Sequence, residues 1–225
     1  MNVKQDFDRI TEMLSALIEG TDAAQLDDST PCSDFAVRDL IGHFTLGRFL
    51  FAAGFAADKE RGDELLAGMP ARMGDVVADG HKETYRDASE RLEHALEGFP
   101  DLDQPVSLVF GEMPGSYALQ MLSADNFIHC WDLATATGQQ FDPPEDLIES
   151  THAFFEGFIT DASRDGGSFA PAVEVAADSS SLDRLLGLCG RQASALSVHD
   201  DDTFGCRRCT VRELATSRPF GVRGR

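Results

Sequence analysis

The stretch SYALQMLSADNFIHCWDLATATG, residues 116–138, carries the clearest structural signal in the chain. Its apolar residues recur with the helical period, at Leu119, Leu122, Ile128 and Leu133. Steps of three and four place such residues on one face of an α-helix, and Gly138 suits the end of that helix. The sequence therefore predicts a long helix here.

Three polar residues follow the same period within this stretch. Asp125, His129 and Asp132 stand at offsets i, i+4 and i+7, which stack them on one helix face. Leucines flank that face, so we expect it to point into the protein. Burying two carboxylates and an imidazole costs several kcal/mol unless another group compensates for their charge. A divalent metal ion would provide that compensation.

A second helix supplies another candidate ligand. In residues 33–55, Ser33 is the expected N-cap, and His43 lies on or beside the apolar stripe. His43 with a carboxylate-x-x-x-His pair makes a three-ligand set that leaves coordination positions open. From spacing alone a second interpretation stays open, since a hydrogen-bonded core histidine and an i, i+4 ion pair give the same pattern.

The rest of the chain predicts an all-α protein, a four-helix bundle with extra short helices and a C-terminal appendage. Periodicity and end signals place its other helices at 3–19, 76–98, 144–161 and 182–191. A loop is expected over 58–75, and an extended connector over 101–116 with a turn at Pro114–Gly115. We expect the bundle domain to occupy residues 1–196 and an Arg-rich, poorly ordered or appended tail to occupy 197–225.

Composition restricts the partners. The 225 residues contain 39 acidic and 19 basic side chains, for a net charge of −20. Such a chain disfavours nucleic acid and anionic membrane surfaces. The sequence has no long apolar span and no apolar signal core, and its five cysteines are odd in number and scattered, so we expect a cytoplasmic protein with reduced thiols.

Three blocks of sequence resemble a known family. They are TPCSDFAVRDLIGHFTLG at 30–47, FGEMPGSYALQMLSADNFIHCWDLATATGQ at 110–139 and PAVEVAADSSSLDRLLGLCGR at 171–191. Their order and spacing are similar to those of the DinB-like, mycothiol-dependent maleylpyruvate isomerase-type metal-binding proteins. The resemblance extends over about residues 1–195.

The resemblance implies a four-helix bundle that holds a divalent ion, zinc in the first place and nickel as an alternative. Its ligands map onto His43, Asp125 and His129. The family's best-known member has Glu at the carboxylate position, where this chain has the shorter Asp125. Asp132 is therefore an alternative ligand, or a partner that fixes the tautomer of a histidine.

The implied activity is that of a metal-dependent thiol S-transferase or thiol-assisted isomerase, in which the metal binds mycothiol as thiolate. Its partners are then a small-molecule thiol and an electrophile, and a homodimer is allowed. A non-catalytic sensor or scaffold, and a hydrolase that uses metal-bound water, remain alternatives. The sensor interpretation rests on the tail, where His199, Cys206 and Cys209 offer an incomplete zinc site.

For other polar and aromatic residues near these motifs, the sequence gives weaker evidence of a role in substrate binding or catalysis. Arg48 follows His43 by five positions and is expected on a solvated face, although it has the charge to meet a substrate carboxylate. Packing roles are expected for four others, namely Tyr117, Phe127, Cys130 and Trp131.

Overall fold

The computed structural model describes residues 2–32, 35–99, 101–167 and 169–192. Its helices are α1 Val3–Glu19, α2 Val37–Phe55, α3 Lys59–Ala67, α4 His81–Gly98, α5 Gly115–Thr137, α6 Glu145–Phe158, α7 Asp161–Asp165 and α8 Ser181–Leu188. Two 3₁₀ turns, η1 Ala23–Gln25 and η2 Met73–Val77, and two strands, β1 Pro105–Leu108 and β2 Gly111–Pro114, complete the described elements.

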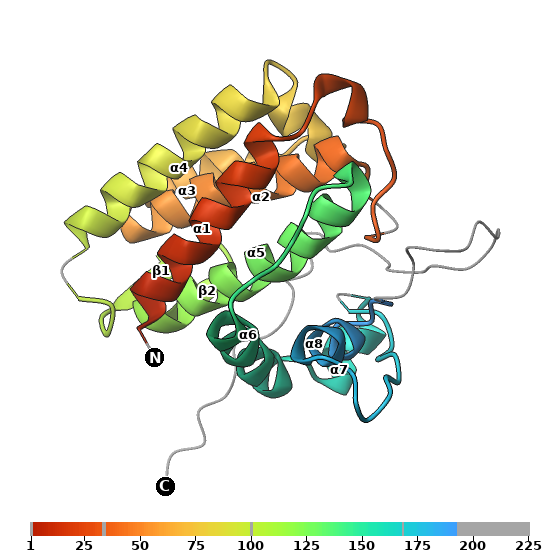
Figure 1. The fold of residues 1–225 in the computed structure, drawn as a ribbon. Coiled ribbons are helices and arrows are strands. Elements are labelled where there is room, and N and C mark those ends of the chain that lie inside the picture. The colour runs from red at the N-terminus through yellow and green to blue at the C-terminus, as the bar shows by residue number, and fades with distance from the viewer. Residues whose placement is uncertain (1, 33–34, 100, 168, 193–225) are drawn as a thin grey trace, which may run out of the picture.

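Helices α1, α2, α4 and α5 form the bundle (Figure 1). The most extensive packing is between α2 and α4 and between α1 and α5. Helix α1 buries a periodic apolar stripe, namely Phe7, Ile10, Leu14 and Leu17, whereas α5 is buried on most sides between Leu122 and Ala134. The expected all-α, four-helix bundle is confirmed.

Helix α2 begins later than the sequence suggested. Its first residue is Val37, and the backbone N–H of Ala36 donates to the Asp39 carboxylate, which satisfies one of the free donors of the first turn. Ser33, the expected N-cap, lies outside the described residues. One turn into the helix, Gly42 lies so close to η2 that a Cβ there would stand 2.0 Å from the Met73 carbonyl oxygen.

Two segments expected to be irregular contain regular structure. Residues 58–75 hold α3 and the start of η2, so the predicted loop is wrong, and α4 starts at His81 rather than at 76. The predicted connector forms a β-hairpin in which Val106 pairs with Met113. Its turn lies between Leu108 and Gly111, where Gly111 has a φ of +140° that favours glycine.

The hairpin was missed because only one of its strands is buried. Val106 and Leu108 of β1 are buried and pack in the core with α2, whereas β2 is largely exposed. Four-residue strands with so few inward positions give little alternation in the sequence.

Helices α6, α7 and α8 lie together on the side of the bundle formed by α5 (Figure 1). Phe154, Phe155, Phe158 and Phe169 make ring contacts there, with centroids 5.1–6.4 Å apart. The short α7 was not predicted, and α6 ends at Phe158 rather than at 161. The predicted tail 197–225, with Cys206 and Cys209, lies outside the described residues.

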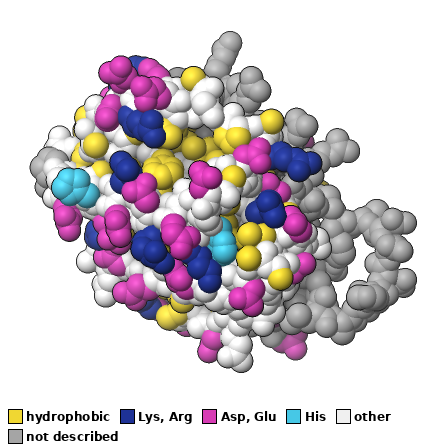
Figure 2. Space-filling model, turned by 90° about the horizontal axis from the view of Figure 1, so that it is seen from above, with side chains coloured by type: hydrophobic (Ala, Val, Ile, Leu, Met, Phe, Trp, Pro, Cys, Tyr) yellow, Lys and Arg dark blue, Asp and Glu magenta, His cyan; other side chains and the backbone are white. Residues whose placement is uncertain are grey.

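Acidic and basic side chains are interspersed over the face shown in Figure 2. Ion pairs on the surface, such as Arg86 with Glu19 at 2.6 Å, are screened by solvent and contribute little, so the apolar core stabilises the fold. Among the described residues, no helix combines the length and the apolar character needed to cross a membrane.

Candidate metal centre

Helix α2 places His43 at the interface with α5. Its side chain is 12 % exposed and lies between the rings of Phe35 and Phe44, whose centroids are 5.8 and 6.1 Å away. These aromatic neighbours restrict the imidazole and direct its Nε2 toward α5.

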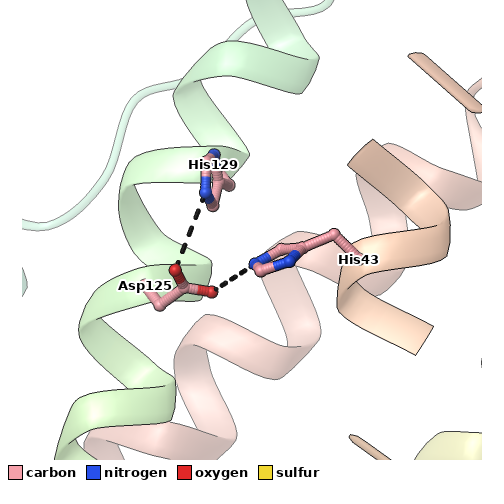
Figure 3. Close-up of side chains that lie close together, drawn as sticks. All are labelled: His43, Asp125 and His129. Carbon is pink, nitrogen blue, oxygen red and sulfur yellow. Dashed lines mark hydrogen bonds and ion pairs between the residues drawn. The ribbon is translucent and has the colours of Figure 1, made fainter. Parts of the chain in front are cut away.

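Helix α5 supplies two side chains opposite His43 (Figure 3). Asp125 Oδ2 lies 3.0 Å from His43 Nε2, and Asp125 Oδ1 lies 3.6 Å from His129 Nε2. One donor atom from each of the three residues lies within 4.8 Å of the others. The structure thus brings together His43, Asp125 and His129, the three residues that the resemblance selected.

The three side chains of the cluster differ in exposure. The side chains of His43 and His129 are 12 % and 3 % exposed, whereas that of Asp125 is 39 % exposed. Asp125 is therefore the member of the cluster that solvent reaches most readily.

Asp132 lies on the far side of His129. Its side chain is fully buried, and its Oδ2 is 2.8 Å from His129 Nδ1. An ionised carboxylate only accepts hydrogen bonds, so His129 must carry its proton on Nδ1, and Nε2 is left as a lone-pair donor. Of the two roles that the sequence left open for Asp132, the geometry matches the partner that fixes a tautomer.

Sequence reasoning missed Arg191, which follows α8. Its Nη2 and Nε donate to Asp132 Oδ2 and Oδ1 at 2.6 and 3.1 Å, and its Nη1 donates to the Cys189 carbonyl at 3.0 Å. A signal did exist, because a carboxylate buried beside a histidine needs a cation and Arg191 ends the third sequence block. Nothing in the sequence alone showed that this block folds back onto α5.

Charge pairing shifts the protonation of Asp132. Burial alone raises the pKa of this carboxyl group, but the charge of Arg191 and the hydrogen bonds from His129 and Arg191 outweigh burial and lower the pKa to about 2. Burial alone would lower the pKa of Arg191, whereas Asp132 holds it well above its ordinary value. Both groups are therefore ionised at neutral pH.

Burial and neighbouring charges also have opposite effects on the pKa values of His43 and Asp125. Burial lowers the pKa of His43, but the charge of Asp125 and its hydrogen bond raise it above the ordinary value. Burial raises the pKa of Asp125, and the neighbouring imidazoles and the charge of Arg191 bring it below the ordinary value. A bound cation would replace the proton that these groups share.

The donor set fits a divalent ion. Two imidazoles and one carboxylate are typical of zinc sites that keep a coordination position open, and one imidazole already has its second nitrogen fixed by a carboxylate. His43 Nδ1 is buried and has no hydrogen-bond partner among the described residues, so its orientation depends on the aromatic walls. The chemistry of the three side chains thus agrees with a metal centre.

The expectation of a solvated Arg48 is wrong. Its side chain is 1 % exposed and lies between Tyr85 and Phe7, with the guanidinium carbon 4.9 and 5.7 Å from their ring centroids. It makes one long hydrogen bond, 3.4 Å, to Thr11 Oγ1, and no carboxylate of the described residues forms an ion pair with it. Arg48 therefore cannot meet a substrate without rearrangement of the core.

The other residues that the sequence singled out contact neighbouring side chains and lie outside the three-residue cluster. Phe127 and Cys130 are fully buried, Trp131 lies partly buried against the cluster around α6, and burial raises the pKa of the Cys130 thiol. Tyr117 is 40 % exposed, contacts Phe154 at a centroid distance of 5.8 Å and has a pKa raised by burial.

The metal sites of helical bundles are built from side chains on facing helices, and the two histidines and one carboxylate of this cluster have that arrangement. Residues 7–134 match the model of the mycothiol maleylpyruvate isomerase N-terminal domain, and the chain belongs to this family.

Relatives agree with this assignment. An uncharacterized protein of Mycobacterium tuberculosis, found in strains CDC 1551 / Oshkosh and ATCC 25618 / H37Rv, is 32 % identical over 143 residues, which are 63 % of this chain and 71 % of the relative. The crystal structure of a histidine-to-alanine variant of mycothiol-dependent maleylpyruvate isomerase is similar in fold. Its TM-score is 0.52 at 16 % identity, over 69 % of this chain and 70 % of that one.

Proposed function

We propose that this protein is a metal-dependent enzyme that uses a low-molecular-weight thiol, with mycothiol as cosubstrate, either to isomerise a small electrophile or to transfer the thiol sulfur onto it. The observation that carries the proposal is the convergence of donor atoms from His43, Asp125 and His129 within 4.8 Å. Membership of the mycothiol maleylpyruvate isomerase family supports the choice of thiol.

In this proposal the three side chains hold a divalent ion, zinc in the first place. When bound, such an ion lowers the pKa of a coordinated thiol enough for thiolate to predominate at neutral pH. His129 is held ready for this role by Asp132, and His43 by Phe35 and Phe44.

The surroundings define where the organic substrate enters. Because Asp125 is the most exposed of the three side chains, we place the entrance for thiol and electrophile beside its carboxylate. Among the described residues Arg48 is too deeply buried to bind a substrate carboxylate, so substrate recognition falls to other groups.

The isomerase reaction balances without a further reagent. The thiolate sulfur adds to one carbon of a cis double bond, and the π-electron pair moves onto the conjugated acceptor. Rotation about the new single bond and breakage of the S–C bond then restore the double bond in trans and release the thiolate. In S-transfer the S–C bond persists. Either the carbanion takes up the proton that the thiol released on ionising, or a leaving group departs with the electron pair of its bond.

Metal content tests the proposal first. Inductively coupled plasma mass spectrometry on the full chain, purified without chelator and reloaded with zinc, is expected to find about one ion per chain. His43→Ala and His129→Ala should lose it, whereas His94→Ala, an exposed histidine on α4, should keep it.

The proposed reaction is tested by measuring enzymatic turnover with and without thiol. The zinc-loaded protein should isomerise or consume an electrophile such as maleylpyruvate only when thiol is present, and His43→Ala should not. A wild type that stays metal-free after reloading, or a loaded wild type with no thiol-dependent turnover, would overturn the proposal.

A further inference from the structure

Arg191 reaches the metal centre from outside the family domain. The family match ends at residue 134, whereas Arg191 lies 59 positions beyond its partner Asp132. The Arg191 side chain is 9 % exposed and that of Asp132 is fully buried, and two hydrogen bonds join Nε and Nη2 of the arginine to the two carboxylate oxygens. Such bidentate pairs fix geometry as well as charge.

A turn at the end of α8 directs Arg191 inward. The Arg191 N–H donates to the Leu186 carbonyl at 2.8 Å and the Gly190 N–H to the Gly187 carbonyl at 3.0 Å, the bond pair of a Schellman motif. Gly190 has a φ of +78°, as that motif requires. Reversal of the chain at this glycine brings the next side chain back toward α5.

The end of α8 is itself held in place. Arg164 of α7 donates to the Leu188 carbonyl at 2.9 Å and also to the carbonyl of Ala170. Gly190 packs so closely on Ala170 that a Cβ would lie 2.7 Å from the Ala170 Cβ. The segment that presents Arg191 is therefore anchored on both sides.

We propose that Arg191 is a positioning residue of the metal centre, which acts through Asp132 to hold His129 with Nδ1 protonated and Nε2 aimed at the ion. This inference rests on the proposed function and extends it. The chain of contacts runs from Arg191 to Asp132 to His129 Nδ1, and the opposite imidazole nitrogen faces the Asp125 carboxylate. Partners behind a ligand of this kind typically change metal affinity by about 10–100-fold.

Arg191 also sets the charge of the centre. Asp125 and Asp132 together cancel the charge of a divalent ion, so the Arg191 guanidinium leaves the centre itself with one positive charge, and the buried Arg48 adds a second cation to the bundle. A buried positive charge favours an anionic ligand such as a thiolate over a neutral one, because the interior screens charge weakly.

The test compares five variants with the zinc- or cobalt-loaded wild type. Arg191→Gln should weaken metal binding about 10–100-fold, measured by competition with a chelator, and should alter the visible spectrum of bound Co²⁺. Arg191→Lys keeps the charge and one hydrogen bond, so its loss should be smaller. Arg184→Gln, which replaces an exposed arginine on α8, should match wild type in both readouts.

A double variant tests whether Arg191 acts through Asp132. Asp132→Asn/Arg191→Gln removes both buried charges, so it should fold even if Arg191→Gln alone does not. The double variant is compared with Asp132→Asn, which already lacks the carboxylate behind His129. If Arg191 acts through Asp132, Arg191→Gln adds no further loss of metal affinity to that of Asp132→Asn. If the two losses add in full, Arg191 does not act through Asp132 and the inference is wrong.

The tautomer of His129 gives a readout that needs no metal. Long-range ¹H–¹⁵N correlation spectra of the metal-free protein at pH 9 should show the Nδ1–H form of His129 in wild type and a mixture of tautomers in Arg191→Gln. Unchanged spectra and unchanged affinity in Arg191→Gln would overturn the inference. A wild type that binds no metal but shows the tautomer effect would overturn the proposed function alone.

Discussion

His43 Nε2 and Asp125 Oδ2 lie 3.0 Å apart, although 82 positions separate the two residues in the chain. This contact joins α2 to α5 and makes Asp125 the oxygen donor of the proposed centre. Asp125→Asn should weaken zinc binding at least about tenfold, because an amide is a poorer ligand than a carboxylate. Asp125→Glu should bind zinc within about tenfold of wild type, because the partly exposed side chain has room for one methylene. Chelator competition measures both, and wild-type affinity in Asp125→Asn would show that the oxygen ligand is elsewhere.

Stability should depend on the ionisation of Asp132. Its pKa is about 2 in the folded protein and about 3.8 when unpaired. Because the folded value is the lower one, the stabilisation is fully present above about pH 4 and is lost as pH falls toward 2. It amounts to about 2 kcal/mol at neutral pH. Urea unfolding at pH 7, 4, 3 and 2 measures it, and Asp132→Asn should remove this part of the acid sensitivity. An identical acid profile in Asp132→Asn would contradict the assignment.

Two glycines of α2 should respond oppositely to alanine. At Gly42 a Cβ would lie 2.0 Å from the Met73 carbonyl oxygen, so Gly42→Ala must push η2 away and should destabilise the protein by about 2–3 kcal/mol. At Gly47 the nearest atom, Leu122 Cδ1, is 3.9 Å away, and Gly47→Ala should stabilise by about 0.5–1 kcal/mol through helix propensity. Urea unfolding of the two variants checks the pair, and equal effects would contradict the close approach of α2 to η2.

Arg48 should be replaceable by an apolar side chain. It is buried between Phe7 and Tyr85, its Nε donates to none of the described residues, and it forms no ion pair among them. Arg48→Met removes the cost of a buried charge and keeps most of the volume, so the free energy of unfolding should stay equal or rise by about 1 kcal/mol. Arg48→Ala should lose about 2–4 kcal/mol because it leaves a cavity. A large loss in Arg48→Met, measured by thermal unfolding, would reveal a buried anion that pairs with the guanidinium.

The sequence predicted α1 and α5 well because apolar residues recur every three or four positions in both stretches. Their observed bounds lie within a residue or two of the expected ones, although α5 is buried on most sides rather than along one stripe. It also selected His43, Asp125 and His129, since two ligands on one helix are fixed by spacing and the third came from the resemblance.

What the sequence could not show depends on contacts between distant segments. The environment of Arg48 is set by α1 and α4, so its position five residues after His43 suggested a solvated face that the structure does not have. Arg191 reaches Asp132 only after the chain has passed through α6, α7 and α8. Helix α3 was missed because its sequence is mostly polar and only Gly62 is buried.

The distance along the chain between Asp132 and Arg191 has a consequence for biosynthesis. Once the ribosome has added His129, all three proposed ligands exist, yet 59 further residues separate Asp132 from its counter-charge. At about 5–20 residues per second, that interval lasts roughly 3–12 s. During translation the nascent bundle therefore carries a carboxylate that has no cation to accompany it into the core. Acquisition of the ion is expected to follow chain completion, so a truncated or stalled translation product that contains every proposed ligand would still load metal poorly.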